Sequence, residues 1–140
     1  QSGCDATLKR MARRTTQAKF RTLVEAARAR IADLALSTDV IAGFPGETDT
    51  EFETSFAFVR EMDFMKLHVF RYSKRPGTAA AKMPGHVAED VKKARSARLS
   101  LAQTLYNVTA AEELARQMER NLSEENVLAF TLDRMYHGVA

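Results

Sequence analysis

A short apolar segment that runs into a glycine-rich turn and then into a helix start constrains the fold of this chain most strongly. Residues 34–42 are mainly apolar and are followed by Gly-Phe-Pro-Gly at residues 43–46. Short apolar runs bounded by glycine are typical of strands buried on both faces. Thr48 and Glu51 have the spacing of a capping box, in which each side chain accepts a hydrogen bond from the other residue's amide. The order predicts a strand, a tight turn and a helix.

The neighbouring segments extend this unit into α/β order. The helix after Thr48 carries apolar side chains on one face (Phe52, Phe56 and Val59), and residues 66–72 form a second predicted strand. Upstream, Asp5 can cap a short helix. Thr15 or Thr16 can start another helix, with the apolar stripe Phe20, Leu23, Val24, Ala27 and Ile31. Strands joined by a crossover helix are expected to be parallel and right-handed.

The region from residue 88 to residue 120 is helical in composition and contains neither proline nor glycine. We expect one long helix, or two helices broken near residues 107–109, where a β-branched pair weakens helix propensity. Ser123 can cap a last helix that ends at Gly138, although residues 127–132 also fit a strand. We therefore divide the chain into an α/β region at residues 1–100 and a helical tail at residues 101–140.

Length and composition limit the possible classes of protein. A chain of 140 residues is too short for a complete (β/α)8 barrel, which needs about 250 residues. Its 45% hydrophobic and 28% charged residues indicate a globular domain. No apolar run has the length of a membrane helix, so we expect no membrane association and a cytoplasmic location. A single cysteine, Cys4, excludes an internal disulfide and a cysteine-based structural zinc site.

Charge is distributed unevenly along the chain. Residues 9–30 hold eight lysines or arginines against one acid, whereas residues 47–63 hold six acids against one arginine. The basic cluster from Lys9 to Arg14 could contact nucleic-acid phosphates, although charge-rich helix faces are more often simply solvated. We expect one basic face and one acidic segment.

The candidate binding residues follow the two predicted strands. Gly43 and Gly46 allow a ligand to approach the backbone closely, or they serve only a tight strand-to-helix connection. Asp39, in an otherwise apolar strand, needs a partner, which is either a neighbouring loop or a ligand. The loop at residues 72–78 holds cations, a hydroxyl and an aromatic ring, and it suits an anion or a nucleobase unless it is merely solvated.

No catalytic or metal site is predicted. The three histidines His68, His86 and His137 lack metal-ligand spacing, and no nucleophile elbow is present. We interpret the histidines as structural or exposed and Cys4 as a buried thiol.

Several short sequence motifs occur together in the order and spacing that one enzyme family shows. They are residues 1–5, residues 8–11 with Arg13 and Thr16, residues 37–48 and residues 68–84. Over residues 1–100 the chain resembles the methylthiotransferase family of radical SAM enzymes. The opening Gln-Ser-Gly-Cys-Asp and the Lys-Met-Pro at residues 82–84 most resemble the branch that methylthiolates threonylcarbamoyladenosine in tRNA.

This resemblance implies the carboxy-terminal half of a partial (β/α)6 barrel. In the family, a [4Fe-4S] cluster binds S-adenosylmethionine and cleaves it to a radical, and a second S-adenosylmethionine supplies the methyl group. By position, the residues that would bind the cofactor are Gln1, Ser2, Asp39, Gly43, Phe44, Pro45, Glu47 and Tyr72. Those that would face the substrate are Arg75, Pro76 and Gly77. The difficult chemistry belongs to the cofactor, so the protein's task is placement and exclusion of water.

The chain also departs from the family. The cluster motif Cys-x3-Cys-x2-Cys is missing, and beyond about Leu105 there is no sign of the β-rich RNA-binding TRAM domain. We therefore expect a fragment that is inactive alone and binds no cluster or S-adenosylmethionine alone. Its uncovered sheet edge and inner face predict self-association, for which exchange of the long helices between chains is one route. Two alternatives are a non-enzymatic α/β module that binds RNA or protein, and a methylthiotransferase for another tRNA adenosine or a ribosomal protein.

Overall fold

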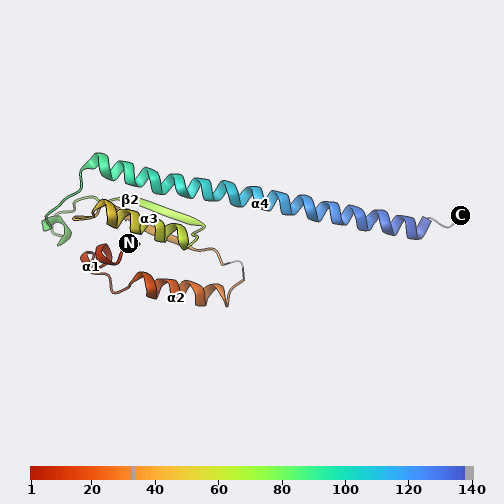
Figure 1. Ribbon diagram of the computed structural model, residues 1–140, viewed down its shortest axis with the longest axis horizontal. Coiled ribbons are helices and arrows are strands. Elements are labelled where there is room, and N and C mark those ends of the chain that lie inside the picture. Colours follow the sequence, from red (N-terminus) through yellow and green to blue (C-terminus); the bar gives the residue numbers. More distant parts are fainter. Residues whose placement is uncertain (33, 138–140) are drawn as a thin grey trace. The chain divides into compact units, whose positions relative to one another are not determined.

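The computed structural model describes residues 1–32 and 34–137, and their side chains as far as residue 122. Its elements are α1 (Asp5–Arg10), α2 (Gln17–Arg28), β1 (Ser37–Ala42), α3 (Asp49–Glu61), β2 (Lys66–Arg71), the 3-10 turn η1 (Ala80–Lys82) and α4 (Glu89–His137) (Figure 1). The chain divides into two compact units, residues 1–104 and a second that begins at Leu105.

The two strands form a parallel sheet with α3 as the crossover between them. Their register runs from Ser37 opposite Lys66 to Ala42 opposite Arg71. This confirms the predicted α/β order. Strand β1 begins at Ser37 rather than at residue 34, and β2 ends at Arg71 rather than at residue 72.

The core lies on one face of this sheet. Val40 and Ala42 of β1 pack there with residues of three helices and the loop before β2 (Val24, Phe52, Phe58, Val59, Met62, Phe64 and Leu99). Ser37 and Asp39, which alternate with the core residues along β1, are exposed. The prediction of a strand buried on both faces is therefore wrong, because the helices of residues 1–104 cover only one side.

Two of the four predicted helix caps, Thr16 and Thr48, are confirmed. Thr48 and Glu51 form the full capping box of α3, with the Glu51 amide donating to Thr48 Oγ1 at 3.2 Å and the Thr48 amide to Glu51 Oε2 at 3.0 Å. Thr16 caps α2. Asp5, however, is the first residue of α1 and not its cap. Its carboxylate accepts the Gln17 amide at 2.7 Å and so ties α1 to the start of α2.

The last helix is one continuous element (Figure 1). The predicted break near residues 107–109 is absent, because a β-branched pair costs only a few tenths of a kcal/mol per residue, about the level of other ordinary residues. The Thr109 hydroxyl also donates to the Leu105 carbonyl oxygen within the helix. No separate helix begins at Ser123, and the alternative strand at residues 127–132 is wrong. Among the described residues, no helix is long and apolar enough to cross a membrane.

Two leucines of α4 test this assignment of the core. Leu99 is 1% exposed within the cluster, whereas Leu101 is 59% exposed. We expect Leu99→Ala to lower the free energy of unfolding by about 2–5 kcal/mol, because it removes buried methyl groups and leaves a cavity. Leu101→Ala should change it by no more than about 0.5 kcal/mol. Urea denaturation followed by circular dichroism measures both, and equal effects would contradict the packing described here.

Candidate functional site

The uncovered face of the sheet and the loops at its carboxyl edge enclose a hollow of about 930 Å³. Five of the predicted site residues line it: Gln1, Asp39, Phe44, Tyr72 and Arg75. They come from the chain start, β1, the β1–α3 loop and the segment after β2. Because both strands are parallel, their carboxyl ends meet at one edge, which brings these distant segments together.

The floor of the hollow is the side of the sheet that the core does not use. Ile41 and Phe70 are register partners, so their side chains leave the sheet on the same side, and both line the hollow. Phe70 is 53% exposed. An exposed aromatic ring on an open sheet face offers a flat apolar surface to a ligand.

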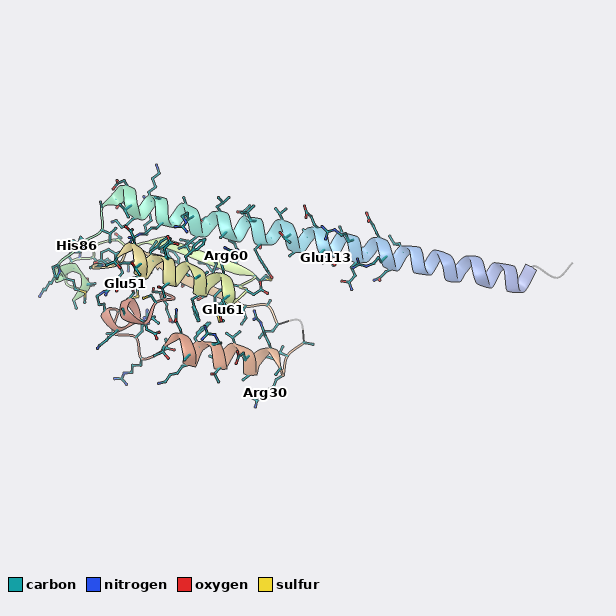
Figure 2. All side chains as sticks on the ribbon, viewed as in Figure 1. Arg30, Glu51, Arg60, Glu61, His86 and Glu113 are labelled. Carbon is teal, nitrogen blue, oxygen red and sulfur yellow. The ribbon has the colours of Figure 1, made fainter. Side chains whose placement is uncertain are left out.

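Three rings gather where the strands end. Phe44 packs edge-to-face on Tyr72 with ring centroids 5.4 Å apart, and His86 stacks on the same tyrosine at 5.8 Å. Figure 2 shows His86 at the end of the unit where the β2–α4 loop lies. The Tyr72 hydroxyl oxygen is buried and has no hydrogen-bond partner among the described residues. A buried hydroxyl without a partner costs about 1–3 kcal/mol, which a ligand atom can recover.

Behind the hollow, a buried ion pair fixes the β1–α3 loop. The Glu47 side chain is 1% exposed and that of Arg95, in α4, is 7% exposed. Glu47 Oε2 accepts hydrogen bonds from the Gly43 amide and from Arg95 Nη1, both at 2.8 Å. Burial raises the pKa of Glu47, while the Gly43 amide and the Arg95 charge oppose that shift. Arg95 also donates to Asp49 at 2.7 Å, which joins α4 to the start of α3.

The glycines of this loop are required by its shape. Gly43 and Gly46 have φ angles of +75° and +77°, a region that side-chain-bearing residues rarely adopt. A Cβ atom on Gly43 would collide with the side chain of Lys92. The Gly46 amide donates to the Gly85 carbonyl oxygen at 2.8 Å, which joins the β1–α3 loop to the β2–α4 loop.

The remaining predicted site residues do not line the hollow. Pro45 is fully buried, and Gly43 and Glu47 lie behind the loop surface. The Ser2 hydroxyl donates to Ser55 Oγ at 3.3 Å, so it bonds to α3. Pro76 and Gly77 are exposed in the loop after β2.

Asp39 needed a partner according to the sequence, but its environment removes that need. The carboxylate is exposed and hydrogen-bonds no other described side chain or amide, while the backbone oxygen accepts the Gln1 nitrogen at 2.9 Å. Strand β1 is open on this side, so water solvates the charge. The Asp39 carboxylate is therefore available to a ligand in the hollow.

The family resemblance implies two groups, a [4Fe-4S] cluster and S-adenosylmethionine, and the residues present fit only the second. Three thiolates are needed for the cluster, yet the single cysteine Cys4 is buried, and the described residues contain no group of three His, Cys, Asp or Glu that could hold a metal. The chain therefore does not fit the cluster. The hollow has the size of a small-molecule site and is lined by aromatic and polar side chains, which fits S-adenosylmethionine.

Comparison with known proteins identifies relatives. No protein-family model matches the chain. The tRNA-2-methylthio-N(6)-dimethylallyladenosine synthase of Streptomyces griseus is 47% identical over 103 residues, which cover 74% of this chain and 20% of that protein. The ribosomal protein uS12 methylthiotransferase RimO of Geobacter sulfurreducens is 50% identical over 99 residues, which cover 71% of this chain and 22% of that protein. The threonylcarbamoyladenosine tRNA methylthiotransferase MtaB of Bacillus subtilis is 43% identical over 125 residues, which cover 89% of this chain and 27% of that protein.

These similarities show that the chain belongs to the radical SAM methylthiotransferase family. It spans about a fifth to a quarter of the length of the curated relatives that it matches. The three relatives are named for different substrates but have similar identities to this chain. Overall identity therefore does not separate the substrate branches.

The buried pair can be tested against an exposed one on the same helix. Arg95→Met should lower the free energy of unfolding by about 3–5 kcal/mol, because it leaves the Glu47 charge buried without its partner. Arg98 pairs with Glu53 but is 50% exposed and stacks on Phe56. Arg98→Met should lower the free energy of unfolding much less, because both members of its pair are solvated.

Urea denaturation at neutral pH measures both values. Adding Glu47→Gln to the Arg95→Met variant should restore part of the lost stability, since it removes the unpaired charge. A failure to restore it would contradict the role given to the ion pair.

Proposed function

We propose that this chain is part of a radical SAM tRNA methylthiotransferase, which adds a methylthio group to a modified adenosine of tRNA in the cytoplasm. Within that enzyme, the chain would form one wall of the pocket that binds S-adenosylmethionine and the substrate. The observation that carries this proposal is the hollow at the sheet edge, where Phe44, Tyr72 and Arg75 meet. The family relationship supports the reaction.

The sheet itself supports a partial (β/α)6 barrel. The Gln1 nitrogen donates to the Asp39 oxygen at 2.9 Å, and the Ile41 amide donates to the Gln1 oxygen at 2.8 Å. These two bonds form the repeat of a parallel ladder centred on Val40. Gln1 thus lies beside β1 where the end of a preceding parallel strand would lie. We infer that β1 and β2 are the fifth and sixth barrel strands.

The proposed roles follow from where the residues lie. Gln1, Asp39, Phe44 and Tyr72 would contact S-adenosylmethionine, whose role when bound is to supply the radical and the methyl group. Ser2, Gly43, Pro45 and Glu47 would hold that wall in shape from behind. Arg75, Pro76 and Gly77 would face the tRNA. Because the sequence holds a single cysteine, we propose that the chain is inactive and holds no cofactor by itself.

A chimera tests this proposal. The segment of the Bacillus subtilis relative that matches this chain would be replaced by the chain, and tRNA nucleosides would be analysed by mass spectrometry. We expect the methylthiolated nucleoside to form. Tyr72→Phe should lower the rate about fivefold, the effect of losing one hydrogen bond of about 1 kcal/mol, since a ligand atom would use the buried hydroxyl.

Tyr106→Phe, the same change on α4, is the matched control and should leave the rate unchanged. A folded, iron-containing chimera that forms no methylthiolated nucleoside would contradict the proposed function. An unchanged rate for Tyr72→Phe would contradict the role of its hydroxyl.

We also propose that the isolated chain self-associates. The sheet face exposes Phe70, and α4 exposes apolar side chains beyond residue 104 (Leu105, Val108, Leu114, Met118 and Leu122). Apolar surface of this kind is normally covered by a partner. Light scattering at micromolar concentration should give a mass above that of the 15.6 kDa monomer, and Val108→Glu with Leu114→Glu should reduce it if the long helices mediate contact. A well-folded monomer would contradict this proposal.

A further inference from the structure

Two arginines from distant parts of the chain line the same hollow, and neither has a carboxylate partner among the residues that the structure describes. Arg13 follows α1, and Arg75 follows β2. A third arginine on the wall, Arg71, pairs with Glu89 at 2.8 Å. Among the described residues, neither the Arg13 nor the Arg75 guanidinium has an ion pair or a hydrogen bond. The wall therefore carries two cations whose charge is available to a ligand.

The backbone beneath each arginine is fixed by a turn. After α1, the Arg13 amide donates to the Leu8 oxygen at 2.9 Å and the Ala12 amide to the Lys9 oxygen at 3.0 Å, while Ala12 has a φ of +55°. This is the Schellman arrangement that ends many helices. Helix α1 is anchored in turn by Arg10, which bonds both carboxylate oxygens of Glu51. The position of the Arg13 backbone is thus set before any ligand arrives.

Arg75 is held similarly. Its carbonyl oxygen accepts hydrogen bonds from the Thr78 hydroxyl at 2.8 Å and from the Thr78 amide at 3.3 Å. Both turns leave the arginine side chains exposed. Because only the side chains must become ordered, binding through them costs little conformational entropy.

The rest of the wall suits a nucleotide between the two cations. Phe70 supplies aromatic surface that is not assigned to S-adenosylmethionine, and Asp39 is the one acidic side chain among the described lining residues. Aromatic rings stack on unpaired bases, and arginine binds phosphate oxygens through two parallel hydrogen bonds. An RNA strand presents a phosphate on each side of every base, whereas a protein substrate does not.

We propose that Arg13 and Arg75 bind the backbone phosphates that flank the nucleotide entering the hollow. This inference rests on the proposed function, because it takes the hollow as the substrate pocket. It adds Arg13, which the sequence placed only in a general basic cluster, to the substrate-binding residues. The two arginines then act as one clamp contributed by separate segments.

The test is the salt dependence of RNA binding by the full chain. The probe is an anticodon stem-loop RNA that carries the modified adenosine before methylthiolation, with affinity measured by fluorescence anisotropy over a series of salt concentrations. Arg13→Gln and Arg75→Gln should each reduce the slope of log affinity against log salt by about 0.7–0.9, the amount expected for one lost phosphate contact. In the double variant, the slope should be reduced by about twice that amount.

Arg30→Gln is the matched control, because it removes the same charge. Figure 2 shows Arg30 at the end of the residue 1–104 unit opposite His86, away from the strand tips. Its slope should equal that of the wild type. Thermal unfolding of every variant should be unchanged, since these arginines are exposed.

Three results would overturn the inference. They are unchanged slopes in the Arg13 and Arg75 variants, an equal loss in Arg30→Gln, and no RNA binding by the wild-type chain at low salt. The chimera separates this failure from failure of the proposed function. There, the two substitutions should raise KM for tRNA and leave kcat unchanged. An active chimera with an unchanged KM would overturn the clamp and keep the enzyme assignment.

Discussion

The buried charge of Glu47 is the constraint on which the candidate site depends. A carboxylate at 1% exposure requires compensation, and it obtains this from the Gly43 amide on one side and Arg95 on the other. The first bond fixes the turn that presents Phe44 to the hollow. The second brings the first turns of α4 against the start of α3. One carboxylate thereby couples the end of β1 to a helix that begins more than forty residues later.

Local patterns in the sequence predicted the elements that depend on local contacts. The capping box at Thr48 and Glu51 and the existence of the two strands follow from a few adjacent residues, so the sequence predicted them directly, although it did not predict that β1 is buried on one face only. Asp5 was misassigned because its partner, the Gln17 amide, lies in the next helix. The missing break in α4 has a related cause, since a small loss of propensity at residues 107–109 does not overcome the hydrogen bonds of a continuous helix.

The sequence predicted those parts of the candidate site that follow from the order of the strands. Parallel strand order implies that the loops after β1 and β2 share an edge, and the structure does bring Phe44, Tyr72 and Arg75 together. The sequence did not predict the burial of Arg95, because nothing near it in the sequence distinguishes it from Arg98, which is exposed. Arg13 likewise looked like any residue of a basic helix. Only the turn at Ala12 and the three-dimensional hollow separate it from its neighbours.

The contact between Gly46 and Gly85 has a consequence for the loops at the carboxyl edge of the sheet. Their backbones approach so closely that a Cβ on Gly85 would lie 3.4 Å from the Gly46 Cα, and the amide-to-carbonyl bond between them measures 2.8 Å. The hydrogen bond therefore joins the loops at the two strand tips into one rim, and the uncovered sheet face beside that rim exposes Phe70.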